Sequence, residues 1–180
     1  MVKELVERIR KQDQRAMSEL YQQYVDELSS VCYRYVPDES DAKDVLQNSF
    51  VKIFQSIATL DFRGEEALKA WMKRVVANEA LRHLKTQKRL TYIDYNDVDL
   101  LLMTDDDEPE AEHLSPDELH KLISGLPDGY RTVLNLYVFE GYSHRQIAEL
   151  LGINESTSAS QLYYARRLLA RRIKELMKGK

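Results

Sequence analysis

The spacing of hydrophobic residues along the chain predicts a series of helices. A first helix is expected over residues 3–11, and a longer one over 15–36, which ends before Pro37. A third helix begins near Ser40, and the break in periodicity at residues 61–64 indicates a loop. A strongly amphipathic helix follows, with these hydrophobic positions on one face: Leu68, Trp71, Met72, Val75, Val76 and Leu84.

The last third of the chain carries a second group of helix signals. Start signals at residues 115–117 and 126–128 each open a helix, the first with serine as N-cap and proline at the first helical position. Ser143 has capping-box spacing to Gln146 at the start of a short helix, and Gly152 supplies a tight turn before the last helix. This order predicts a helix-turn-helix, which binds DNA.

Residues 91–114 separate the two groups of helices. They show no sustained hydrophobic period and include the acidic run Asp105–Glu108 followed by Pro109. We therefore expect an all-α fold of two small domains, residues 1–90 and 115–180, joined by a flexible acidic linker over 91–114.

One face of the last helix is expected to be polar. Hydroxyl and amide groups can bond base edges, and arginines can bond phosphates. An ordinary solvated face is the alternative. The residues assigned to this face are Ser158, Ser160, Gln161, Tyr164, Arg166 and Arg167.

Charge is distributed unevenly, although the formal net charge is only −4 over 180 residues. Basic residues dominate residues 63–89 and the end of the chain, and the stretch between them is acidic; two basic modules fit a DNA-binding protein. The single cysteine, Cys32, excludes a disulfide framework and is expected in the core. No segment has the roughly 20 apolar residues that cross a bilayer, and the charged start does not resemble a signal peptide, so we expect a cytoplasmic protein.

Three segments resemble the extracytoplasmic-function (ECF) sigma factors of bacterial RNA polymerase. LPDGYRTVLNLYVFEGYSHRQIAELLGINESTSASQLYYARRLL resembles their region four. DAKDVLQNSF, at residues 41–50, is similar to their region 2.2, and FRGEEALKAWMKRVVANEALRHLK to their melting loop and region 2.4. The segments stand in the family's order, and the similarity covers nearly the whole chain.

The resemblance implies a sigma factor whose first domain binds the clamp helices of core RNA polymerase and opens the minus-ten element. The second domain, a winged-helix-like sigma region four, would read the minus-thirty-five element and contact the polymerase flap. An anti-sigma partner is expected, and no cofactor or metal. The acidic linker would follow the RNA exit path of the polymerase, unless it is a solvated spacer.

The resemblance also assigns site residues. Polymerase-binding positions would be Asp41, Asp44, Gln47, Asn48 and Phe50, unless the polar ones form only a solvated acidic face. The minus-ten positions would be Phe62, Arg63, Leu68, Arg74, Asn78, Arg82 and Lys85, with Lys88 and Arg89 as further phosphate ligands. Asn78 would bond an unpaired base, unless it is a surface or capping residue. Thr157 joins the polar face of the last helix as a minus-thirty-five position.

The chain departs from the family's pattern at several of these positions. Asn48 stands where an acidic residue is usual, and Leu68 where an aromatic residue is usual. Ser156 replaces the common Gly, and Ala159 replaces a common Lys or Arg, which removes one phosphate contact.

Two other classes of function remain possible. A stand-alone helix-turn-helix regulator would share the second domain but would not explain Asn78, the second basic helix or the DAKDVLQNSF segment. An enzyme is not expected, because the four histidines have no metal-ligand spacing with carboxylates and no nucleophile motif or phosphate-binding glycine loop is present.

Overall fold

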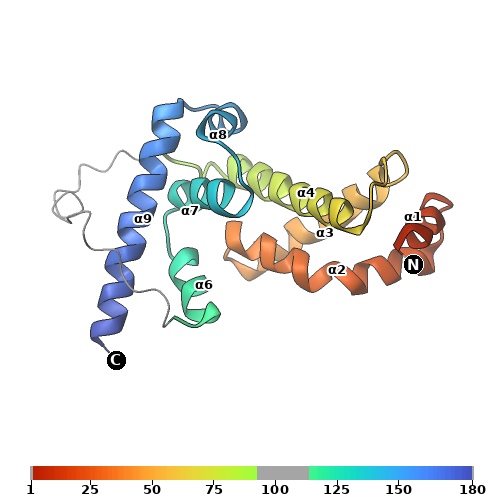
Figure 1. Ribbon diagram of the computed structural model, residues 1–180, viewed down its shortest axis with the longest axis horizontal. Helices are drawn as coiled ribbons and strands as arrows, with labels where there is room; N and C mark the ends of the chain where they lie inside the picture. Colours follow the sequence, from red (N-terminus) through yellow and green to blue (C-terminus); the bar gives the residue numbers. More distant parts are fainter. Residues whose placement is uncertain (1, 93–113, 180) are drawn as a thin grey trace. The chain divides into compact units, whose positions relative to one another are not determined.

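The computed structural model describes residues 2–92 and 114–179, and every regular element in these parts is a helix (Figure 1). The chain divides into two compact units, Met1–Thr86 and Gln87–Lys180. Most of the expected linker, including its acidic run, lies outside the described residues. The prediction that it follows the RNA exit path of the polymerase therefore also concerns residues outside the described part. None of the described helices is long and apolar enough to span a membrane. The all-α fold of two helical units is confirmed.

Side-chain caps fix where two helices of the first unit, α2 and α3, begin. Helix α1 covers Val2–Arg10, and Asp13 then caps α2, Gln14–Tyr35, by accepting from the backbone N–H groups of Arg15 and Ala16. Asp38 caps α3, Glu39–Ser56, in the same way, and α4 covers Glu65–Thr86 after the expected loop. Val36, directly before Pro37, is extended, as proline requires of its predecessor.

Helices α2, α3 and α4 pack on one another, and α1 packs on α2. The cysteine is part of this core: the Cys32 side chain is buried, and burial raises the pKa of its thiol to about 12. Trp71 is only half-buried, whereas Leu68 and Met72 on the same helix are fully buried. The largest fully buried side chains of the unit are Leu20, Leu28, Tyr35, Ile53, Ile57, Leu68, Met72 and Leu84.

The second unit confirms the expected helix starts. Helix α6, Pro116–Ser124, begins with a capping box between Ser115 and Glu118. Helix α8, His144–Leu151, begins with another, in which the Ser143 N–H donates to Gln146 Oε1 at 2.9 Å. Gly152, with φ 71°, ends α8 in the left-handed conformation that glycine adopts without strain, and α9 runs over Glu155–Lys178.

The helix that opens at residues 126–128 does not continue as a single α-helix. Helix α7 covers only Asp128–Leu134, and the chain then widens into a π-helical turn, η2, over Asn135–Phe139. The turn is closed by a bond from the Glu140 N–H to the Asn135 carbonyl, one residue longer than in an α-helix. Because the turn ends the regular helical face, Tyr137, Val138 and Phe139 are exposed rather than buried with Leu134 and Leu136.

Helices α7, α8 and α6 all pack on α9 (Figure 1). Ile147, Ala148 and Leu151 of α8 are buried, and so are Leu162, Ala165 and Leu168 of α9. Helix α8, the Gly152 turn and α9 form the expected helix-turn-helix. Its second helix therefore has one face fixed in the core and one available to a ligand.

Candidate polymerase and nucleic-acid interfaces

Helix α3 presents a polar stripe to solvent. Asp44, Gln47 and Asn48 are all exposed, and their spacing places them on one face of the helix. Asp41 lies one turn earlier and is half-buried, with Oδ2 at 3.4 Å from Nε2 of His83 on α4. This face offers carboxylate and amide groups to a partner that carries basic side chains.

Phe50 does not belong to that stripe. Its side chain is 4% exposed, and its ring packs against Tyr21 of α2, with centroids 4.6 Å apart, and against Phe54. The assignment of Phe50 as a polymerase contact is corrected, because the packing of α3 on α2 buries it. Val51, at 48% exposure, follows Asn48 on the exposed stripe instead.

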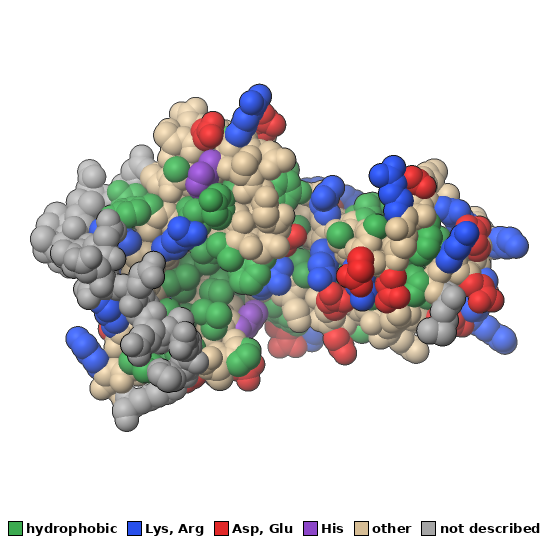
Figure 2. Space-filling view, in the orientation of Figure 1, with side chains coloured by type: hydrophobic (Ala, Val, Ile, Leu, Met, Phe, Trp, Pro, Cys, Tyr) green, Lys and Arg blue, Asp and Glu red, His purple; other side chains and the backbone are tan. Residues whose placement is uncertain are grey.

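Helix α4 presents a second stripe, which is basic. Arg74, Asn78, Arg82 and Lys85 are exposed, and their spacing of four, four and three residues keeps them on one face. Figure 2 shows blue and red side chains interspersed on the visible face of this unit. An amide between arginines suits a strand whose phosphates are held while a base is bonded.

Glu79 holds one member of the basic stripe in place. Its carboxylate is buried, at 4% exposure, and binds Lys52 Nζ and Arg82 Nη2, the latter at 2.8 Å. Burial acts to raise the pKa of Glu79, but the hydrogen bonds from Lys52 and Arg82 outweigh it and hold that pKa below its ordinary value. Glu79 is one of the few acids in the basic segment 63–89, and its buried ion pairs with Lys52 and Arg82 give it a structural role there.

The melting-loop positions are placed unequally. Arg63 is exposed and pairs with Asp61 at 2.8 Å, and Phe62 is half-buried. Leu68 is 1% exposed, so its assignment as a DNA contact is corrected. It lies one turn before Met72 on the core face of α4, and a base could not reach it without unpacking the unit.

The predicted reading face of α9 also needs correction, because Ser158 and Gln161 are fully buried. Both share the face of Leu162 and Ala165, so the periodicity that defines the core already includes them. Thr157 and Ser160 are half-buried, and Ser160 Oγ donates to the Thr157 carbonyl at 3.0 Å. Tyr164 is half-buried and stacks on Tyr130 at 6.1 Å.

The outward face of α9 consists partly of residues that the sequence analysis did not assign. Ser156, Ala159 and Tyr163 are exposed, at the same helical phase as Ser160 and Arg167. Arg166 is exposed, and the guanidinium of Arg167 lies 5.3 Å from the centre of the Tyr163 ring. Projection of the helix from the buried residues, rather than from the polar ones, would have found Tyr163.

Arg89 is held within the second unit rather than left in the basic run. Its Nε lies 2.8 Å from Oδ2 of Asp128, which also binds the buried Arg131. A Cβ on Gly129 would come within 2.5 Å of the Thr91 carbonyl oxygen, so this segment lies directly on α7. We call residues 87–92 the α7 strap.

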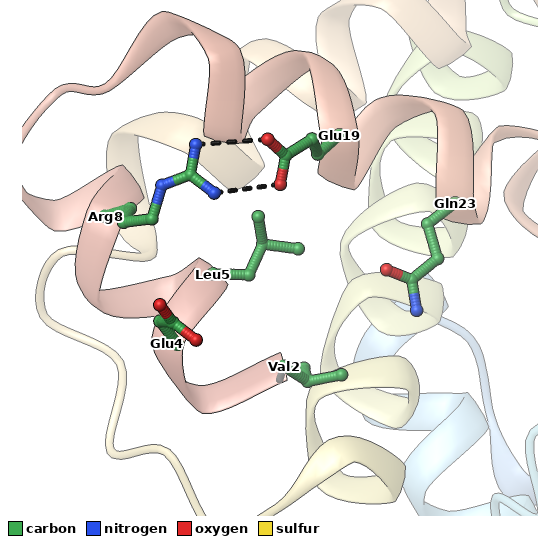
Figure 3. Close-up of a pocket in the computed structure, with 6 residues that line it drawn as sticks. All are labelled: Val2, Glu4, Leu5, Arg8, Glu19 and Gln23. Atoms are coloured by element: carbon green, nitrogen blue, oxygen red, sulfur yellow. Dashed lines mark hydrogen bonds and ion pairs between the residues drawn. The ribbon is translucent and has the colours of Figure 1, made fainter.

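A hollow of about 340 Å³ lies between α1 and α2, lined by Val2, Glu4, Leu5, Arg8, Glu19 and Gln23 (Figure 3). Arg8 reaches across it to Glu19 through two hydrogen bonds of 2.9 and 3.1 Å (Figure 3). Asp13 binds Arg8 as well, and this bond is the main cause that lowers the pKa of Asp13. Arg8 thus joins α1 to Glu19 of α2 across the hollow. Among the described residues, no group of His, Cys, Asp and Glu side chains is placed to hold a metal ion.

Comparison with known proteins places both units in one family. Residues 20–90 match Sigma-70 region 2, and residues 117–169 match Sigma-70, region 4. The ECF RNA polymerase sigma-E factor of Haemophilus influenzae is 33% identical over 96% of this chain and 95% of its own length. The RNA polymerase sigma-H factor of Pseudomonas aeruginosa is 29% identical over 97% and 95%.

A solved structure shows the same fold. CnrH, in complex with the cytosolic domain of CnrY, superposes with a TM-score of 0.50 and 19% identity, over 95% of this chain and 96% of that one. The two matched regions and the full-length relatives agree with the expectation from the sequence, and they do not support a stand-alone regulator. The chain belongs to the ECF sigma factors of RNA polymerase.

Proposed function

We propose that this protein binds core RNA polymerase and directs it to promoters, where it takes part in strand opening and initiation. The observation that carries the proposal is the pairing of an exposed polar stripe on α3 with a basic stripe on α4 in the sigma region 2 segment. A helix-turn-helix in the region 4 segment supplies a second DNA contact. The polymerase performs the chemistry, in the cytoplasm, and this chain supplies recognition.

The α3 stripe is the proposed contact with the clamp helices. Asp44, Gln47 and Asn48 can accept and donate hydrogen bonds to arginines on a partner helix, and Asp44 supplies the charge. Val51 would add an apolar contact beside them, because it is exposed on the same stripe. Asn48 makes a neutral hydrogen bond where the family has an ion pair, so Asp44 carries more of the attraction here.

The α4 stripe is the proposed minus-ten surface. Arg74, Arg82 and Lys85 would bind phosphates, and Asn78 would bond the edge of an unpaired base. Arg63 and Phe62 of the preceding loop would contact the opened strand. With Leu68 in the core, stacking on a flipped base would have to come from Phe62 alone among the assigned residues.

The outward face of α9 is the proposed minus-thirty-five surface, with the second unit also placed on the flap. We assign to it Thr157, Ser160, Tyr164, Arg166 and Arg167, and we add Tyr163, which is exposed on the same face. The functional domains would be residues 1–90 and 115–180, with 91–114 as the connection. A partner that inhibits the factor until a signal arrives is expected from the family.

Binding to core polymerase tests the proposal at the α3 stripe. Purified core should capture the wild-type chain stably, and Asp44→Asn should weaken capture by about tenfold through loss of a charge-assisted hydrogen bond. Asp26→Asn is the matched control, because Asp26 is an exposed acid on α2 outside the stripe. If the wild-type chain does not bind core, the proposed function is wrong. If both variants bind as wild type, the assignment of the stripe is wrong.

A further inference from the structure

Aromatic and cationic side chains from different elements meet at the edge of the α9 face. Tyr137 of η2 stacks on His144, the first residue of α8, with ring centroids 4.7 Å apart and planes at 21°. The guanidinium carbon of Arg166, on α9, lies 5.8 Å from the centre of the Tyr137 ring. We call Tyr137, His144 and Arg166 the Tyr137 stack.

Ser158, which was predicted to lie on the polar face of α9, instead anchors the stack in the core. Nδ1 of His144 lies 3.0 Å from Oγ of Ser158, which is fully buried on α9. A buried hydroxyl requires a partner, and this hydrogen bond supplies one while it fixes the orientation of the imidazole. Ser158 therefore orients His144 and does not contact a DNA base.

The π-helical turn accounts for the position of Tyr137. Its ring is 36% exposed, beside two more exposed apolar residues of the same turn, instead of lying under α9 with Leu136. Single π-helical turns are rare and are found frequently at functional sites. Here the turn places an aromatic ring where it meets both the start of α8 and an arginine of α9.

We propose that Tyr137 and His144 are positioning residues that hold Arg166 toward a phosphate of promoter DNA. An aromatic face holds a guanidinium by its plane and leaves its N–H groups free to bond a phosphate at the edge. The stack also restricts a long side chain before binding, which lowers the entropy lost on binding. This inference rests on the proposed DNA-binding role of the α9 face.

A double-mutant cycle on the full chain tests the inference. The probe is a duplex of mixed sequence, about 30 base pairs long, which is enough to bind one chain. Binding is followed by fluorescence anisotropy from roughly 50 to 200 mM salt, a range over which the number of phosphate contacts strongly affects affinity. Arg166→Ala should weaken binding and lower the salt slope by about one unit. Tyr137→Leu retains apolar bulk without the aromatic face and should weaken binding about three- to fivefold. Tyr137→Phe should bind as wild type.

The decisive comparison is the double variant. If Tyr137 acts through Arg166, Tyr137→Leu has no further effect in the Arg166→Ala background. Equal losses in both backgrounds, or no loss on Tyr137→Leu alone, would overturn the inference while the DNA-binding face stands. No loss on Arg166→Ala would instead show that this part of the α9 face does not bind DNA, and the proposed minus-thirty-five surface would fail with it.

Discussion

Ala159 is exposed on the outward face of α9, at a position where the resemblance to the family implies a basic residue. Ala159→Lys restores a cation on this face, so we expect tighter binding to promoter fragments of any sequence and a salt slope steeper by about one unit. The measurement is affinity as a function of salt. Gln22→Lys, which adds the same charge at an exposed position of α2, is the control. An unchanged slope for Ala159→Lys would contradict the assignment of the face.

Glu79 joins α4 to α3 by accepting a bond from Lys52, and it also binds Arg82 on its own helix. Glu79→Gln should lower the free energy of unfolding by about 1–2 kcal/mol, a range reduced because Lys52 and Arg82 are partly exposed. Denaturant unfolding measures the change. Glu66→Gln is the control, because Glu66 pairs with Lys69 while its side chain is 88% exposed.

The pH dependence of this effect has a definite sign. The pKa of Glu79 in the folded protein lies below the ordinary value of 4.5. Its ion pairs therefore stabilise the fold fully above the pKa of the unfolded carboxyl and are lost as the pH falls through the lowered folded pKa. The difference in stability between wild type and Glu79→Gln should shrink below pH 4.5. A difference that stays constant as the pH falls well below 4.5 would show that the carboxylate is not the stabilising group.

The site residues that the sequence predicted wrongly share one cause: their burial was not considered. Ser158, Gln161, Leu68 and Phe50 were assigned by residue type or by resemblance, yet each is buried. The helical phase set by Leu162 and Ala165 was enough to place Ser158 and Gln161 in the core. The partner of Ser158 was not predictable, because His144 lies 14 residues away in sequence and meets it only after α8 packs on α9.

The elements were mostly predictable, because their boundaries depend on local chemistry. Capping boxes at Ser115 and Ser143 and the left-handed Gly152 fixed helix ends that the sequence alone could locate. The π-helical turn after α7 was not predictable. Nothing in the spacing of hydrophobic residues distinguishes a bond that spans five residues from one that spans four.

The packing of the α7 strap against Gly129 predicts the effect of a substitution at this glycine. Alanine normally favours a helix over glycine by about 1 kcal/mol, so a free α7 would be stabilised by Gly129→Ala. Because the new Cβ would come within 2.5 Å of the Thr91 carbonyl, we expect destabilisation by about 1–3 kcal/mol and faster hydrogen exchange at residues 87–92.

Gly179→Ala is the matched control, because its Cβ would meet no atom closer than 3.6 Å. Stabilisation of the Gly129→Ala variant, with exchange over residues 87–92 as in wild type, would contradict a docked strap. Release of the strap would also free Arg89 from Asp128. Hydrogen exchange therefore reports whether the strap holds Arg89 in the free protein.

The uneven charge distribution explains how a chain of net charge −4 can bind nucleic acid. Basic side chains are concentrated on the α4 stripe and toward the end of α9, and residues 91–114 are acidic in sequence. Each unit by itself offers a modest set of phosphate contacts. We expect promoter specificity to require core polymerase, which would hold the minus-ten and minus-thirty-five surfaces at a defined spacing.

Run-off transcription with purified core RNA polymerase on genomic fragments, followed by start-site mapping, tests whether the chain directs core polymerase to promoters. We predict discrete products that require both the chain and core, with a shared pair of sequence elements upstream of each start. Asn78→Ala should reduce these products because the base contact in the minus-ten surface is lost. If a folded chain gives no promoter-dependent product with any fragment, it does not direct core polymerase to promoters, and the proposed function is wrong.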